Sequence, residues 1–193
     1  QDLVGFGRRN MKVAPAEVTD IVMYQIGALE AFCRANGIAM QHVKPHGAMY
    51  NMAEKDDKLA EAICRGIKAV NPELILLGPG SGKMVKAAKA LGLKTAGEVF
   101  ADRAYMEDGT LVPRSQEGAM ITDEEEAVAR VLEMVQKGTV TAITGKKIEV
   151  QADSICVHGD GQKALLFVQK IRSELEKAGV VIAPMKEVIV GES

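Results

Sequence analysis

The chain has 193 residues, of which 47% are hydrophobic and 26% charged, a composition typical of one soluble globular domain with a substantial core. The formal net charge of -2 and the scattered Lys and Arg residues argue against a surface that binds nucleic acid or an anionic membrane. No apolar run approaches the roughly 20 residues that span a bilayer, and the first residues lack the apolar core of a signal peptide. We therefore expect a cytoplasmic protein that acts on a small molecule.

Helices and apolar strands are predicted to alternate along almost the whole chain. The helices carry apolar residues at helical spacing, and the segments NGI, LGL and AGV each join a glycine at a helix end to an apolar strand. The predicted elements of the first half are a helix over 15–36, a strand from Ile38, a helix with Leu59, Ile63, Ile67 and Val70 that ends at Asn71, a strand over 74–78, a helix over 82–91 and a strand over 93–101.

The second half continues this pattern after a loop. Thr122 and Glu125 have the spacing of a capping box, which predicts a helix that runs to Gly138. We expect this helix to bury Val128, Leu132 and Val135. The predicted elements that follow are a hairpin formed by TVTAI, TGKK and IEVQA and inserted as a flap, the strand SICVHG, a helix over about 162–178 and a last strand VVIAP.

The alternation of helices with continuous apolar strands indicates an α/β fold with a parallel sheet covered by helices. Periodicity does not distinguish a β/α barrel from a doubly wound sheet, but in both folds ligands bind at the carboxyl ends of the strands. The three cysteines, Cys33, Cys64 and Cys156, are odd in number and have no CxxC spacing. We expect them to be buried thiols and not disulfide or zinc ligands.

Clusters of polar residues follow four of the predicted strands. Because these ends meet at one edge of a parallel sheet, we interpret the clusters as one active site on a common rim. The residues after each strand are Lys44, His46, Tyr50 and Asn51; Pro79, Gly80, Ser81 and Lys83; Glu98, Asp102 and Arg103; and His158 and Asp160.

The two rim histidines are the main candidates for chemistry. Imidazole titrates near neutral pH, so His46 or His158 could move a proton or bind a divalent metal. Asp160 or Asp102 could orient the ring or share the metal, which makes His46, His158 and Asp160 the candidate ligands. His42 lies inside a predicted strand, and we expect a structural role for it.

Three loops offer possible anion-binding groups. The GPGSGK turn is not a P-loop, because Leu77 and Met84 occupy the places of its first glycine and its hydroxyl residue. It is either an anion site at a helix start or simply a tight turn. In GFGRRN, Arg8 and Arg9 are either substrate ligands or solvated, ion-paired loop residues.

The segment ADRAYMEDGTLVPR is predicted to fold back on the site like a lid. Asp102, Arg103 and Arg114 flank a turn at Asp108-Gly109. The acidic run over 123–126 is interpreted as favourable charge at a helix start.

Four motifs occur here in the same order as in the LamB/YcsF family: GFGRR, VKPHGAMYN, EVFADRAYMEDGTLVPR and DSICVHGD. The chain resembles this family over nearly its whole length. The resemblance implies a parallel β/α barrel with fewer than eight strands, similar to the polysaccharide deacetylases. The implied activity is that of 5-oxoprolinase, the ATP-dependent opening of the 5-oxoproline lactam to L-glutamate. It requires partner subunits B and C, which are implied to use the ATP, and a homo-oligomer is possible.

Family members usually begin with a further stretch that holds an Asn-Cys-Asp-containing strand and a His-Ala-Gly-Asp loop. The resemblance therefore implies that residues 1–193 form a single β/α-barrel domain that lacks the first strands of the family at its N-terminus. Any metal site inferred from this chain would be incomplete for the same reason.

The resemblance leads to a hypothesis for the reaction, in which the partners use ATP to activate the lactam carbonyl for attack by water. His46 or His158 would be the general base, oriented by Asp160 or Asp102. Lys44 or Arg103 would stabilise the oxyanion, and the expected substrate-binding residues are Arg8, Arg9, Asn51, Glu98, Arg103 and Arg114. The alternatives are a metal-dependent deacetylase-like hydrolase and a noncatalytic 5-oxoproline-binding or regulatory subunit.

Overall fold

The computed structural model describes residues 2–158 and 164–191. The chain divides into two compact units, and each is described by itself. Unit 1 is formed by Gln1–Ala96 with Ile189–Ser193, and unit 2 by Gly97–Val188. No helix among the described residues is long and apolar enough to cross a membrane.

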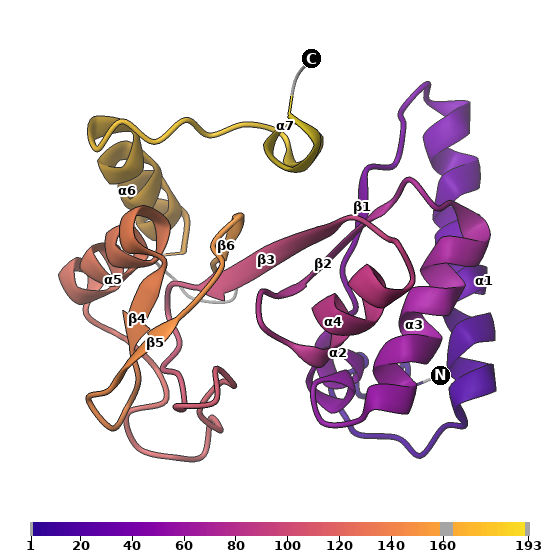
Figure 1. The fold of residues 1–193 in the computed structure, drawn as a ribbon, viewed down its shortest axis with the longest axis horizontal. Helices are drawn as coiled ribbons and strands as arrows, with labels where there is room; N and C mark the ends of the chain where they lie inside the picture. Colours follow the sequence, from indigo (N-terminus) through magenta and orange to yellow (C-terminus); the bar gives the residue numbers. More distant parts are fainter. Residues whose placement is uncertain (1, 159–163, 192–193) are drawn as a thin grey trace. The chain divides into compact units, whose positions relative to one another are not determined.

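Unit 1 combines two parallel strands with four helices (Figure 1). Its elements are α1 (Pro15–Ala35), β1 (His42–Val43), α2 (Gly47–Ala53), α3 (Asp57–Val70), β2 (Ile75–Pro79) and α4 (Lys83–Ala90). Strands β1 and β2 pair in parallel with His42 opposite Ile75. Leu76 N–H donates to Lys94 O at 2.9 Å, so the segment that leads into β3 (Thr95–Phe100) lies beside β2.

The core of unit 1 depends on a close approach between α1 and α3, which lie side by side (Figure 1). A Cβ atom added at Gly66 would lie 2.9 Å from Thr19 O, so only glycine permits this crossing. Around it, Val22 is buried, and Ile63 and Ile67 are fully buried. Asp56 begins α3 as its N-cap, because its side chain accepts hydrogen bonds from two backbone N–H groups.

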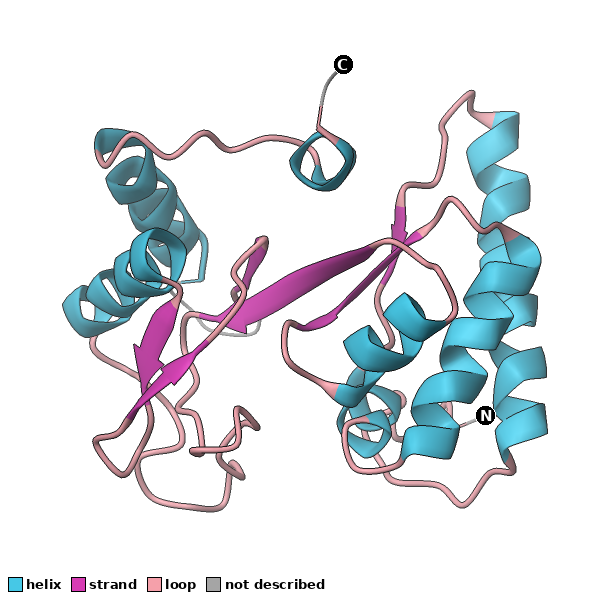
Figure 2. Ribbon diagram, viewed as in Figure 1, coloured by secondary structure: helices cyan, strands magenta, loops and turns pink. Residues whose placement is uncertain are grey.

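Unit 2 continues from β3 and contains more irregular structure, as the loops in Figure 2 show. Its other elements are α5 (Glu124–Lys137), β4 (Thr139–Thr141), β5 (Lys147–Glu149), β6 (Ser154–Cys156) and α6 (Ala164–Lys177). The last helix, α7 (Met185–Val190), begins in unit 2 and its final residues are assigned to unit 1. Strands β3 and β6 are parallel, with Glu98 opposite Ser154. Strands β4 and β5 form an antiparallel hairpin.

The structure confirms the predicted α/β fold, the parallel pairing and the hairpin. The long helices also lie where periodicity predicted them, within a few residues. The single-domain prediction for residues 1–193 and barrel closure stay predictions.

Four details of the sequence-based prediction were wrong. The strand expected from Ile38 begins at His42, and a short helix, α2, lies between β1 and α3 where no helix was expected. The N-cap of α5 is Asp123 and not Thr122, because the Asp123 carboxylate accepts the Glu126 N–H at 2.8 Å. Residues 180–184, the expected strand VVIAP, are irregular and precede α7.

The buried face of α5 also differs from the prediction. Val128 is buried as expected, but Leu132 and Val135 are only half-buried. The inward residues are Ala127, Val128, Val131 and Met134, so the face is rotated by about one residue. When the apolar stripe of a helix is wide enough to include both sets of residues, the sequence alone does not show which set faces the core.

Candidate active site

The most distinct polar arrangement of unit 2 joins Asp102, which follows β3, to His158, which follows β6. Their Oδ2 and Nδ1 atoms lie 2.7 Å apart, and the two side chains are 15% and 28% exposed, respectively. A carboxylate only accepts hydrogen bonds, so Nδ1 of His158 carries the proton. In the neutral imidazole, Nε2 is then the basic nitrogen, available for proton transfer.

An aromatic pair supports this histidine. The ring of Phe100 stacks on that of His158, with centroids 6.1 Å apart and an interplanar angle of 21°. The Phe100 N–H donates to the Tyr105 hydroxyl at 2.8 Å, and both residues are buried. Burial raises the pKa of Tyr105 well above its ordinary value, so the hydroxyl stays protonated at neutral pH.

The segment between Asp102 and Ile121 folds back on itself as a packed loop, and that it covers the site like a lid stays a prediction. Ile121 N–H donates to Asp102 O at 2.9 Å, and Ala104 N–H donates to Ala119 O at 3.0 Å. The predicted turn is confirmed at Gly109, whose φ is 82°. A small apolar core formed by Ala104, Val112 and Ala119 holds the loop together.

Arg103 lies within this loop and is 7% exposed. Its Nη2 donates to Val112 O at 2.5 Å. Arg130 of α5 donates to the carbonyl groups of Arg103 and Thr141, at 3.3 and 3.2 Å. Arg130 and Tyr105 were not predicted from the sequence, because both act on backbone groups that no motif marks.

In unit 1, the VKPHGAMYN segment forms the start of α2. His46 is the N-cap position, and its Nε2 donates to Phe6 O at 3.0 Å, since a carbonyl oxygen only accepts. The Phe6 ring meets the imidazole edge-on at 5.5 Å. Gly47 has a φ of 61°, and a Cβ added there would lie 2.5 Å from Gly7 O, so the GFGRR loop packs directly on this turn.

The other predicted residues of unit 1 have local contacts. Lys44 Nζ lies 5.7 Å from the centroid of the Tyr50 ring. Asn51 Nδ2 donates to Gly47 O within α2 at 3.2 Å. Arg9 forms an ion pair with Asp2 in its own loop, which matches the ion-paired alternative. Arg8 is exposed.

The GPGSGK turn already holds an internal carboxylate. Glu54, at the end of α2, accepts the N–H groups of Lys83 at 2.8 Å and Met84 at 3.2 Å at the start of α4. A Cβ at Gly82 would lie 2.1 Å from Glu54 Oε2, so this glycine is needed for the approach. Desolvation raises the pKa of Glu54 even though these two N–H groups oppose the change. The helix start is therefore occupied by a side chain of the protein.

The described residues do not gather three metal-binding side chains of the His, Cys, Asp or Glu type. His158 could offer Nε2 to a metal while Asp102 holds Nδ1, but His158 alone is not a ligand set. Asp160, the third metal candidate, lies outside the described residues. The hydrogen bond between His158 and Asp102 fits proton transfer.

The predicted rim residues are distributed between the two units. Lys44, His46 and Asn51 belong to unit 1, whereas Asp102 and His158 belong to unit 2. Buried Glu98 and Arg103 are also in unit 2, as is Arg114, which is exposed. That all of them share one rim stays a prediction.

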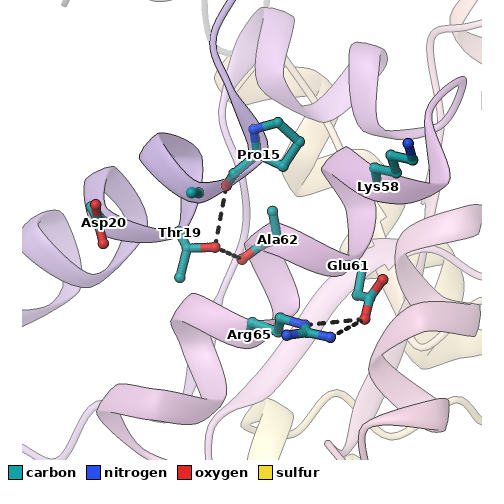
Figure 3. A pocket seen from close by; sticks show the side chains of 8 residues that line it. Pro15, Thr19, Asp20, Lys58, Glu61, Ala62 and Arg65 are labelled. Atoms are coloured by element: carbon teal, nitrogen blue, oxygen red, sulfur yellow. Dashed lines mark hydrogen bonds and ion pairs between the residues drawn. The ribbon is translucent and has the colours of Figure 1, made fainter.

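A surface cavity of about 470 Å³ lies between α1 and α3 of unit 1 (Figure 3). The Thr19 hydroxyl donates to Ala62 O at 2.9 Å, and Arg65 pairs with Glu61 on the other side. None of the predicted site residues lines it; its lining is Pro15, Ala16, Thr19, Asp20, Lys58, Glu61, Ala62 and Arg65.

Comparison with known proteins agrees with the resemblance seen in the motifs. The chain is 63% identical over 187 residues to the A subunit of 5-oxoprolinase from Clostridium beijerinckii, covering 97% of this chain and 73% of that protein. It is 52% identical to the corresponding protein of Bacillus subtilis, covering 96% of this chain and 72% of that protein.

A solved structure shows the same fold. The crystal structure of a lactam utilization protein from Thermus thermophilus superimposes with a TM-score of 0.88 at 45% sequence identity, covering 94% of this chain and 72% of that one. A model of the LamB/YcsF family matches residues 1–190. The chain therefore belongs to the LamB/YcsF family.

Proposed function

We propose that this chain is the A-type subunit of an ATP-dependent 5-oxoprolinase, which opens the lactam of 5-oxoproline to give L-glutamate. Relatives that are 50–63% identical carry the name of this subunit. The observation within the molecule that supports the proposal most is the hydrogen bond between His158 Nδ1 and Asp102 Oδ2. The proposal includes a barrel architecture and partner subunits of the B and C type.

The chemistry assigned to this pair is general base catalysis. Asp102 holds His158 in the tautomer that leaves Nε2 basic, and Nε2 removes a proton from the water that attacks the lactam carbonyl. The ring C–N bond then breaks, and the proton is returned to the departing nitrogen, which becomes the amine of glutamate. Stacking on Phe100 limits rotation of the imidazole.

ATP supplies activation of an amide carbonyl that resonance makes unreactive. In this proposal the partner subunits bind the ATP. At the start of α4, the N–H groups of Lys83 and Met84 are already bound by the Glu54 carboxylate. This contact supports placing the nucleotide on the partners.

Release of glutamate from 5-oxoproline by the chain with ATP and both partner subunits tests the proposal. Glutamate should form only when all three proteins and ATP are present. Binding of 5-oxoproline without any release would instead indicate a noncatalytic subunit. Release that needs no ATP and is abolished by chelators would indicate a metal-dependent hydrolase.

A further inference from the structure

Arg103 is a buried cation without an anionic partner among the described residues. The residue is 7% exposed, and the ion pairs among residues 2–158 and 164–191 do not include it. Nη2 donates to the carbonyl group of Val112, whereas the buried Nε–H has no acceptor. Burying a charge is unfavourable unless it is paired and hydrogen-bonded, so this guanidinium has an unmet requirement for an anion.

The surrounding charges show the same imbalance. Burial and the positive charge of Arg114 lower the pKa of Arg103, and the negative charge of Asp102 opposes them only in part. Asp102 uses Oδ2 to bind His158, and its buried Oδ1 has no hydrogen bond either. An additional anion beside Arg103 would therefore stabilise the charged guanidinium.

Arg103 is also held firmly in place. Its carbonyl group accepts a hydrogen bond from Arg130, and the neighbouring Asp102 carbonyl accepts the Ile121 N–H. Arg103 is one residue from Asp102, the partner of His158. A rigid cation at this position in the chain suits recognition of a fixed negative group on the substrate.

We propose that Arg103 is the receptor for the substrate carboxylate, which it binds through its free Nε–H edge, and that it selects lactams bearing a carboxylate over uncharged lactams. A planar guanidinium matches the two oxygens of a carboxylate, which a lysine ammonium does not. This inference rests on the proposed function and assigns Arg103 to substrate recognition. It does not assign oxyanion stabilisation to that residue.

The test compares binding of 5-oxoproline with binding of its uncharged carboxamide, measured by calorimetry on the chain without ATP or partners. The wild type should prefer 5-oxoproline by at least tenfold. Arg103→Gln should weaken 5-oxoproline binding by roughly 10- to 150-fold and leave carboxamide binding within about twofold. Arg103→Lys keeps the charge and should recover only part of the preference.

Arg172→Gln is the matched control, because Arg172 is an exposed residue paired with Glu176 on α6 and the net charge changes equally. Its ligand preference should equal that of the wild type. A wild type without preference for the carboxylate, or an unchanged preference in Arg103→Lys and Arg103→Gln, would overturn the inference. If Arg103→Gln does not fold, Arg103→Lys decides the outcome.

These outcomes are separable from failure of the proposed function. Arg103-dependent binding of 5-oxoproline with no glutamate release in the complete enzyme would refute only the lactam-opening role. Glutamate release whose selectivity is the same in the Arg103 variants would refute only the carboxylate receptor.

Discussion

Replacing Tyr105 by Phe removes one hydroxyl from the interior of unit 2 and with it the hydrogen bond that this oxygen accepts from the Phe100 N–H. The hydrogen bond is 2.8 Å long, Tyr105 is 4% exposed and Phe100 6% exposed, so water cannot readily replace the lost oxygen. Removing one partner of a buried hydrogen bond costs about 1–3 kcal/mol. We expect Tyr105→Phe to lower the free energy of unfolding by that amount.

Urea unfolding followed by circular dichroism measures this loss as a lower midpoint at unchanged slope. The control is Tyr24→Phe, because the Tyr24 side chain is 77% exposed on α1. It should change stability by no more than about 0.5 kcal/mol. Equal midpoints for Tyr105→Phe and Tyr24→Phe would refute the reasoning. Since Phe100 stacks on His158, we also expect Tyr105→Phe to reduce turnover.

Three further predictions concern unit 1 and the thiols. Burial raises the pKa of the Cys64 thiol to about 12, so a thiol reagent at pH 8 should modify half-buried Cys33 and Cys156 in the folded protein and Cys64 only after unfolding. Glu54→Ala should cost about 0.5–2 kcal/mol in urea unfolding, because it removes the cap of α4. Desolvation and nearby Lys44 lower the pKa of His42. As the pH falls below about 6.5, His42 therefore binds a proton more readily in the unfolded chain than in the folded protein, and the free energy of unfolding of the wild type should decrease. The decrease should be less steep in His42→Gln.

Each of these has a clear contrary result. Equal labelling rates for the three thiols in the folded protein would contradict the burial of Cys64. Glu61→Ala, which removes an exposed carboxylate paired with Arg65, is the control for Glu54→Ala and should cost less than about 0.5 kcal/mol. An identical pH dependence of stability in wild type and His42→Gln would exclude His42 as the titrating group.

The parts of the fold that the sequence predicted are those with a long repeated signal. The helices α1, α3 and α5 each span several turns, so apolar spacing and the stop signals at Gly37, Asn71 and Gly138 locate them. The helix α2 has 7 residues and begins at Gly47, two residues after Pro45, so it has too few turns for periodicity to show. The run VVIAP is apolar enough for a strand, yet a strand forms only where a neighbour supplies its hydrogen bonds, and no sequence pattern reports that neighbour.

The candidate site was predictable to a similar extent. Asp102 and His158 follow parallel strands β3 and β6, and adjacent strand ends bring their side chains together. Tyr105 and Arg130 were missed because their partners are backbone groups elsewhere in the chain. The capping of α4 by Glu54 was missed for the same reason, since its carboxylate lies 29 residues before the N–H of Lys83.

The central claim is that His158, oriented by Asp102, is the base that activates water for lactam opening. The most direct test measures glutamate release by the complete enzyme with wild type, His158→Gln, Asp102→Asn and His46→Gln, each shown to be folded. A general base typically contributes about 10²- to 10⁴-fold in rate, so His158→Gln should lower turnover at least tenfold and Asp102→Asn should also lower it. Near-normal turnover in His158→Gln, with the loss appearing in His46→Gln instead, would contradict the account.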